Sequence, residues 1–91
     1  MSYSIEFEPS FKKDFKTCLK RKLNMNLFEE VYTLFSENGK LPLKYKPHVL
    51  KGNWKGFMEC HIQADWLLIW DVDHNTKTIV LVRMGKHDDL F

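Results

Sequence analysis

The sequence predicts an α+β domain in which two helices cover one face of a mostly antiparallel sheet. In the first half of the chain, apolar residues recur at helical spacing, and in the second half three strand-like runs follow one another without a helix between them. Strands and helices separated in this way are typical of α+β folds and not of alternating α/β folds. With 91 residues, the chain is expected to form a single domain over residues 1–91.

An N-terminal strand and a first helix begin the predicted fold. Residues 2–8 alternate apolar and polar side chains, as a strand does, and Pro9 ends this run. Ser10 is the expected N-cap of the helix, because its hydroxyl can accept a backbone N–H bond. Apolar side chains at helical spacing then predict an amphipathic helix that runs to about residue 22.

A second helix is expected to pack antiparallel to the first, because only the short linker "NMN" separates them. Asn26 followed by Glu29 resembles a capping box at its start. Gly39 fits the left-handed position at which many helices end.

The second half of the chain predicts a surface loop and a three-strand antiparallel meander. Residues 40–52 contain two prolines and a glycine, which fit neither a helix nor a central strand. Short polar turns then separate the three runs, as in consecutive hairpins. The predicted strands are Trp54–Ile62, Trp66–Val72 and Thr78–Met84.

Composition excludes several classes of protein. The 44% apolar and 14% aromatic content argues against disorder. No apolar run reaches the roughly 20 residues that cross a bilayer, and the N-terminus has acids where a signal peptide needs basic residues. A cytoplasmic protein with no membrane partner is therefore expected. Cys18 and Cys60 form no CxxC motif and are interpreted as buried thiols.

Positive charge is concentrated although the net charge is only +2. Residues 40–55 contain five lysines and His48 but no acid, which indicates a polyanionic partner. A second basic run, residues 12–22, is interpreted as a solvated helix face. The candidate substrate-binding lysines are Lys44, Lys46, Lys51 and Lys55.

Polar side chains interrupt the apolar pattern at the first turn of the meander. Alternation along the strand places Met58, Cys60 and Ile62 toward the helices, so Glu59 and His61 are expected on the outer face, in a polar groove beside Asp65. In the last strand, the same rule places Val80, Val82 and Met84 on one face and Ile79, Leu81 and Arg83 on the other.

Imidazole, carboxylate and guanidinium groups together suit the cleavage of RNA without a metal. A base takes the proton of the 2′-hydroxyl, an acid protonates the departing 5′-oxygen, and a cation stabilises the phosphoryl oxygens. His48 and His87 are expected to flank the groove, whereas His74 is interpreted as an exposed turn residue. No pair among His48, His61 and His87 has compact zinc-ligand spacing, so neither a metal nor another cofactor is expected.

The C-terminal half of the chain also resembles a known family. The motifs "KYKPH", "LKGNWKGF", "ECHI" with "DWLLIW", and "VRMGKHDDLF" are similar to those of YafQ-type toxins in the RelE/ParE superfamily. The resemblance is most specific over Leu41–Phe91, and the N-terminal helices match in pattern and order. It implies a RelE-like fold and an endoribonuclease that cuts mRNA on the translating ribosome. It also implies a cognate antitoxin, with operator DNA bound only through the toxin–antitoxin complex.

The resemblance further implies roles for individual residues. The expected acid–base set is His48, His61, Asp65 and His87. Of these, His87 is expected to be the general acid and His48 the base, while the other two tune and orient. Arg83 matches the phosphate-stabilising position, Glu59 an acidic position that is expected to bind substrate, and Phe91 the aromatic residue that contacts a base.

The last residues, "GKHDDLF", are expected to be part of the site. Leu90 would tie the tail to the sheet, Gly85 would permit the turn before it, and Phe91 would stack on a substrate base. In the alternative, Phe91 only caps the core.

Two other functions remain open from the sequence. ParE-type gyrase poisons share the superfamily fold but lack the histidine set. A non-catalytic RNA- or ribosome-binding module needs the basic loop but not the histidines. RNA fragments formed in the presence of EDTA would distinguish a metal-independent nuclease from both.

Overall fold

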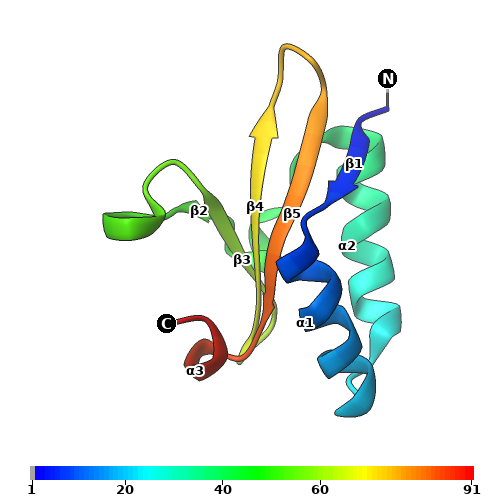
Figure 1. Cartoon of the computed structure of the whole chain (residues 1–91). Helices are drawn as coiled ribbons and strands as arrows, with labels where there is room; N and C mark the ends of the chain where they lie inside the picture. The colour runs from blue at the N-terminus through cyan, green and yellow to red at the C-terminus, as the bar shows by residue number, and fades with distance from the viewer. Residues whose placement is uncertain (1) are drawn as a thin grey trace.

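Five strands form one sheet in the order β1-β5-β4-β3-β2 in the computed structural model, which describes residues 2–91 (Figure 1). The strands are β1 (Ser4–Phe7), β2 (His48–Val49), β3 (Met58–Gln63), β4 (Trp66–Asp73) and β5 (Thr78–Gly85). β1 pairs with β5 in parallel, and the other three pairings are antiparallel. The predicted meander and the mostly antiparallel sheet are therefore confirmed.

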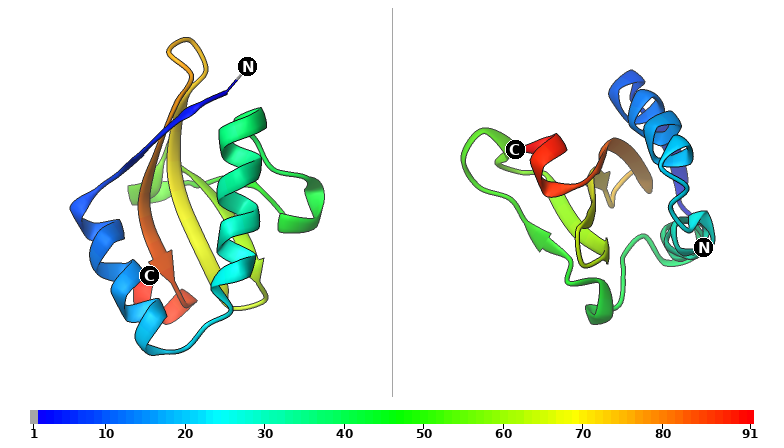
Figure 2. Two further views of the ribbon diagram at one scale, coloured as in Figure 1. Left: turned by 90° about the vertical axis from the view of Figure 1, so that its right-hand side faces the viewer. Right: turned by 90° about the horizontal axis from the view of Figure 1, so that it is seen from below.

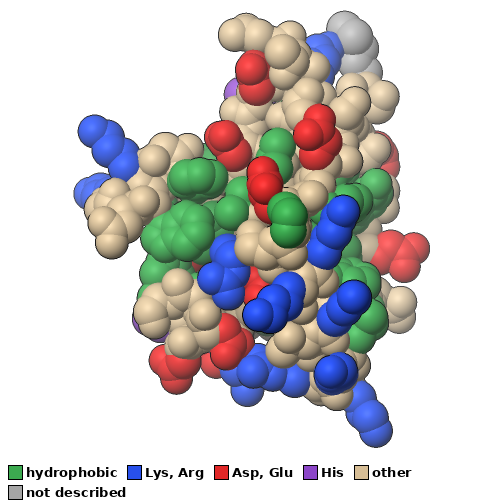
Figure 3. All heavy atoms as spheres, in the orientation of Figure 1, with side chains coloured by type: hydrophobic (Ala, Val, Ile, Leu, Met, Phe, Trp, Pro, Cys, Tyr) green, Lys and Arg blue, Asp and Glu red, His purple; other side chains and the backbone are tan. Residues whose placement is uncertain are grey.

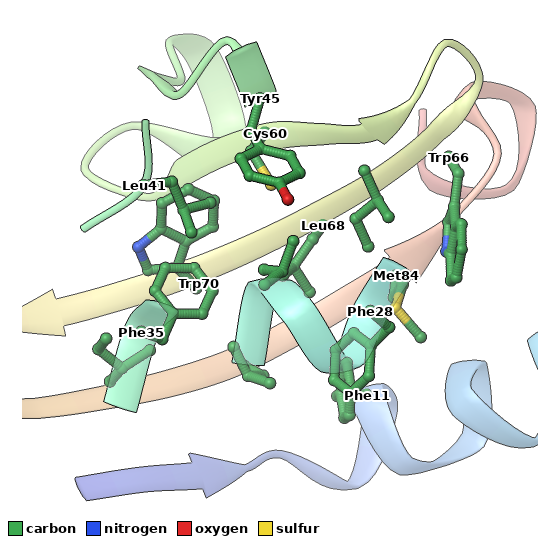
Figure 4. Close-up of a cluster of buried hydrophobic side chains, with 14 of the residues drawn as sticks. Phe11, Phe28, Phe35, Leu41, Tyr45, Cys60, Trp66, Leu68, Trp70 and Met84 are labelled. Atoms are coloured by element: carbon green, nitrogen blue, oxygen red, sulfur yellow. The ribbon is translucent and has the colours of Figure 1, made fainter. Parts of the chain in front are cut away.

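Two helices, α1 (Pro9–Lys20) and α2 (Met25–Asn38), form the predicted antiparallel hairpin on one side of the sheet (Figures 1 and 2). Between hairpin and sheet lies the main core, in which Phe35, Leu68 and Leu81 are fully buried. Aromatic rings fill much of this space, and Phe35 lies edge-on to Trp70 (Figure 4). A short helix, α3 (His87–Leu90), lies on the opposite side of the sheet (Figure 2).

The predicted helix starts were wrong by one or two residues. Pro9 begins α1 rather than only ending the strand, because its fixed φ suits the first helical position. The Ser10 hydroxyl consequently does not cap the helix, and it donates to the Val82 carbonyl at 2.6 Å. Asn24, not Asn26, caps α2 by accepting the Asn26 N–H at 3.1 Å.

The ends of the two helices also differ in how well they were predicted. α1 ends at Lys20, before the predicted residue 22. Gly39 ends α2 in the left-handed conformation (φ 72°), as expected. A Cβ at this glycine would lie 2.3 Å from the ring of Tyr3, so the position needs glycine on steric grounds as well.

The segment of residues 40–57 is more structured than the predicted loop. It contains two single-turn 3₁₀ helices, η1 (Leu43–Tyr45) and η2 (Gly52–Trp54), with the edge strand β2 between them. The strand predicted to begin at Trp54 begins instead at Met58. Positive φ angles at Gly52 and Gly56 turn the chain away from the sheet before that point.

The two faces of the sheet differ from the simple alternation in one respect. Cys60 and Ile62 are buried in the main core, as predicted. On β5, however, a β-bulge between the pairs Ile69–Arg83 and Trp70–Leu81 leaves Val82 without a partner. Met84 therefore faces the main core, whereas Val82 packs with the outer-face residues, so the predicted grouping of these two side chains was wrong.

The outer face was predicted to be a polar groove, and this was wrong in part. It carries a second apolar cluster, in which Leu67, Ile69 and Leu90 are buried. Side chains from the segment of residues 40–57 and from β5 pack around this cluster, and Figure 3 shows hydrophobic side chains gathered on this side. The continuous apolar run of β4 fits a central strand that is covered on both faces.

Candidate active site

The histidines and acids of the outer face follow the cross-strand pairing of the sheet. His48 on β2 pairs with Glu59 on β3, which pairs with Ile69 on β4, which pairs with Arg83 on β5. His61 lies one row away, and its ring centroid is 6.2 Å from that of His48. Strand pairing thus brings together His48, Glu59 and His61, which are separated by up to 13 positions in the chain.

Both ring nitrogens of His48 have partners. Nδ1 lies 2.9 Å from the carbonyl oxygen of Lys46, and Nε2 lies 3.1 Å from Oε1 of Glu59. Because a carbonyl can only accept, we assign the proton on Nδ1 from this partner. The remaining proton of the His48–Glu59 contact lies on either Nε2 or Oε1, and in both cases Nε2 has no free lone pair.

Glu59 is the one acid buried in the described part of the chain, with 5% of its surface exposed. Its second oxygen, Oε2, has no hydrogen-bond partner among residues 2–91. A buried oxygen without a hydrogen-bond partner costs free energy of folding. Such an oxygen is therefore often accounted for by a catalytic role or by a bound molecule that donates to it.

His61 differs from His48 in its free nitrogen. Its Nδ1 lies 3.3 Å from the carbonyl oxygen of Ala64 at the turn between β3 and β4, so Nδ1 is assigned as the donor. Nε2 has no partner in the part of the chain that the structure describes, and the side chain is half-buried. His61 therefore presents a basic nitrogen to the outer face.

Helix α3 begins at His87, and Phe91 follows its last residue. Oδ1 of Asp65 accepts the backbone N–H of His87 at 3.2 Å, which ties the β3–β4 turn to the first residue of α3. The side chain of His87 is 68% exposed. Its ring lies 5.1 Å from the ring of Phe91, which in turn lies 6.5 Å from Trp54.

The expected anchoring of the tail is confirmed. Leu90 is buried in the outer-face cluster, whereas Phe91 remains 52% exposed. The exposure of Phe91 fits stacking on a base better than the alternative, in which Phe91 only caps the core, and the choice between the two stays a prediction. Gly85, just before α3, allows the close approach of Asp89, because a Cβ there would lie 3.1 Å from Oδ2 of Asp89.

Arg83 has a partner that sequence reasoning did not indicate. Its Nε and Nη2 donate to the carboxylate of Asp14 on α1 at 2.6 and 3.2 Å. This hydrogen-bonded carboxylate raises the pKa of Arg83. Met84 N–H also donates to Asp14, at 3.0 Å, so the carboxylate joins α1 to the end of β5. The phosphate-stabilising role of Arg83 stays a prediction.

The lysines of the basic segment are not equivalent. Lys44 forms an ion pair with Glu30 on α2 at 2.8 Å, and this contact lowers the pKa of Glu30. Lys46, Lys51 and Lys55 are exposed and make no ion pair within residues 2–91. Of the four predicted substrate-binding lysines, these three are therefore available to a polyanion.

Other features lie away from this face. His74, at the turn after β4, is exposed as predicted and contacts the hydroxyl of Tyr3 at 2.7 Å. An apolar groove of about 400 Å³ lies against α1 and α2, with lysines among its lining residues and without a histidine or an acid. In residues 2–91, no group of three or more His, Cys, Asp and Glu side chains is placed to hold a metal ion. None of the helices described in that range is long and apolar enough to cross a membrane.

Sequence reasoning missed Asp14, Arg21 and Asp89, which link α1 to β5 and α3. One signal for Asp14 was available, because it is the only acid in the basic run of residues 12–22. Nothing in the local pattern of Arg21 or Asp89 indicated that residues so distant in the chain would meet.

A sequence model of the family described as "Bacterial toxin of type II toxin-antitoxin system, YafQ" matches residues 3–91. The chain belongs to the YafQ toxin family. It is 38% identical over 88 residues to the mRNA interferase toxin YafQ of Escherichia coli K12, covering 96% of this chain and 94% of that protein.

Solved structures agree with this membership of the YafQ family. The toxin chain of the E. coli DinJ-YafQ toxin–antitoxin complex superposes with a TM-score of 0.88 at 36% identity, over 100% of this chain and 99% of that one. A metal-bound toxin from Helicobacter pylori superposes with a TM-score of 0.86 at 37% identity, over the full length of both chains. The expected RelE-like arrangement of strands and helices is thereby confirmed for this YafQ-family chain.

Proposed function

We propose that this chain is a toxin of a type II toxin–antitoxin system and an endoribonuclease that cleaves mRNA on the ribosome by general acid–base catalysis. A relative named as an mRNA interferase supports the reaction, and a relative in complex with DinJ supports a protein antitoxin as partner. The observation that carries the proposal is the placement of a basic His61 nitrogen and an exposed His87 ring on one face of the sheet.

In the proposed reaction, Nε2 of His61 removes the proton of a ribose 2′-hydroxyl. The 2′-oxygen then attacks the adjacent phosphorus and forms a new ester bond, and the bond from phosphorus to the 5′-oxygen breaks. His87, as imidazolium, gives its proton to that departing oxygen. The products are a 2′,3′-cyclic phosphate and a free 5′-hydroxyl, and the two histidines exchange protonation states.

The assignment of the base differs from the sequence-based expectation of His48. Nε2 of His48 is engaged with Glu59, whereas Nε2 of His61 is free, so the geometry favours His61. The His48–Glu59 pair then lies beside the base and forms part of the polar surface around it.

The remaining groups orient the reaction and bind the RNA. Asp65 holds the first N–H of α3, which supports the orienting role expected for it. Phe91 presents an exposed ring next to His87, in position to stack on a nucleobase. Lys46, Lys51 and Lys55 supply positive charge for the phosphate backbone.

The test uses purified protein with free mRNA, with and without EDTA, and with mRNA in translating ribosomes at constant Mg²⁺, which ribosomes need to stay assembled. The expected result is fragments with 2′,3′-cyclic phosphate ends from ribosome-bound mRNA, and any cleavage of free mRNA should be unchanged by EDTA. His87→Ala should lower the rate by about 10²–10⁴, as the loss of a proton-transfer group typically does. His74→Ala is the matched control, because it removes a histidine that lies away from the outer face.

Each alternative predicts a different outcome of this experiment. A non-catalytic module would bind ribosomes and yield no fragments. A gyrase poison would leave mRNA intact and inhibit DNA supercoiling. Cleavage of free mRNA that stops with EDTA would exclude the metal-free mechanism while keeping the nuclease.

A further inference from the structure

An ion pair joins the end of α1 to the helix that carries His87. Arg21, the residue after α1, places Nη1 2.6 Å from Oδ2 of Asp89 and Nη2 3.3 Å from Oδ1. Two parallel contacts of this kind fix the orientation of both planar groups, which a single contact does not.

The same Asp89 carboxylate also holds the start of α3. Its Oδ2 accepts the backbone N–H of Lys86 at 3.0 Å, which satisfies one of the unpaired donors at the helix N-terminus. α3 has only four residues, and a helix of that length has no stability of its own in water. Its position therefore depends on contacts with the rest of the protein.

The approach of Asp89 to the sheet is close. A Cβ on Gly85 would lie 3.1 Å from Oδ2 and 3.3 Å from Cβ of Asp89. The glycine thus leaves the space in which the carboxylate lies between Arg21 and the backbone of Lys86.

A second arginine reaches the same residue. Nη2 of Arg83 lies 3.5 Å from the Asp89 carbonyl oxygen, while the guanidinium is held by Asp14. Asp89 therefore contacts one arginine through its carboxylate and another through its carbonyl. The first, Arg21, directly follows α1, and the second, Arg83, is held by Asp14 of α1. Arg21 and Asp14 occupy one side of α1 toward β5 and α3.

We propose that Arg21 is a positioning residue, which acts through Asp89 to fix α3 and thereby the placement of His87 and Phe91 over the outer face. The role in cleavage rests on the proposed function. Arg21 lies at the α1 end of this contact and is absent from the His48, Glu59 and His61 cluster, so it acts on the reaction through α3.

Loss of the Arg21–Asp89 ion pair should change the position of α3 and not the stability of the whole fold. An exposed ion pair contributes little to the stability of a fold, so its removal should leave the melting temperature nearly unchanged. Misplacement of a catalytic group by about 1 Å can cost about 10²-fold in rate. The Arg21–Asp89 contact should therefore influence kcat far more than Tm.

The test compares Arg21→Gln, Asp89→Asn and the double variant with Lys20→Gln, which removes the same charge from the neighbouring exposed position. We expect kcat to fall about 10- to 100-fold in both single variants, with KM within about twofold. The double variant should be no slower than either single one, because both remove the same contact. Arg21→Lys, which keeps the charge but loses the two-pronged geometry, should be intermediate, and Lys20→Gln should match the unaltered protein.

A second measurement reports position without activity. NMR signals of the His87 and Phe91 rings should shift in Arg21→Gln and stay in place in Lys20→Gln. The proposal would be overturned by unmoved ring signals, by additive rate effects in the double variant, or by a change in KM with unchanged kcat. The last of these results would indicate that Arg21 binds RNA directly. If the unaltered protein cuts no RNA, the proposed function fails, and the ring signals alone then decide whether Arg21 positions α3.

Discussion

Nε2 of His48 and Oε1 of Glu59 lie 3.1 Å apart across the pairing of β2 and β3. This contact determines which nitrogen of the site is free. Since Nδ1 of His48 donates to a backbone carbonyl, the imidazole has no lone pair left for substrate. Within the cluster of His48, Glu59 and His61, the nitrogen that remains free is Nε2 of His61.

The first prediction is that His48 and Glu59 act as a unit. Replacement of either residue by alanine should lower cleavage to a similar extent, and the double variant should be no slower than the single ones. Thermal melts are needed beside the rates, because Glu59→Ala removes a buried side chain and leaves a cavity. Cleavage rates and thermal melts of the four proteins check this, and rate reductions that multiply would contradict it.

The second prediction separates the base from the acid. An RNA analogue with sulfur in place of the bridging 5′-oxygen has a leaving group that needs no proton. Cleavage of this analogue should be restored in His87→Ala but not in His61→Ala, because only the step that uses the acid is bypassed. The ratio of the two substrates' rates is measured for each variant. Restoration in His61→Ala instead would reverse the roles.

The third prediction concerns the lysines. Neutralising Lys46, Lys51 and Lys55 together should weaken RNA or ribosome binding and reduce the slope of log Kd against log salt by about 0.7 for each phosphate that a lysine no longer neutralises. Lys44→Gln is the matched control, since Lys44 is already paired with Glu30. A salt slope that is unchanged in the triple variant would remove these lysines from the RNA-binding surface.

Much of this arrangement could be predicted from the sequence where local patterns determine it. The meander, the helix hairpin and the inward placement of Cys60 follow from periodicity and turn residues. The β-bulge at Val82 could not be predicted, because no local signal marks one extra residue in a strand. The distant pairs likewise depend on how α1 packs against β5, so the contact of Arg83, the expected phosphate-stabilising residue, with Asp14 could not be predicted.

The fourth prediction is a pH dependence of α3. The hydrogen bonds from Arg21, and then from the Lys86 N–H, lower the pKa of Asp89 in the folded protein. A group with a depressed pKa stabilises the fold above its ordinary value, about 3.9 for Asp, and this contribution is lost as the pH falls through the folded pKa. The Phe91 ring signals should therefore change in acid below about pH 4, and this change should be absent in Asp89→Asn. An equal transition in Asp89→Asn would assign it to another carboxyl group.

The fifth prediction contrasts two neighbouring apolar residues at the end of α3. Leu90 is buried against the sheet, whereas Phe91 is 52% exposed with its ring near His87. Leu90→Ala should therefore destabilise the fold by about 2–5 kcal/mol, as the truncation of a buried leucine does. Phe91→Ala should leave Tm nearly unchanged and slow cleavage, because stacking of a base on an aromatic ring contributes about 1–3 kcal/mol.

Thermal melts and cleavage assays on the same preparations distinguish these two effects for Leu90 and Phe91. Phe91→Trp serves as the matched control, since it keeps an aromatic surface at the same exposed position and should retain most of the activity. If folded Phe91→Ala cuts at the rate of the unaltered protein, its ring does not stack on the substrate. The exposed ring would then serve only its contacts with His87 and Trp54, and the RNA would have to be held by the lysines of the basic segment and the groups on the sheet.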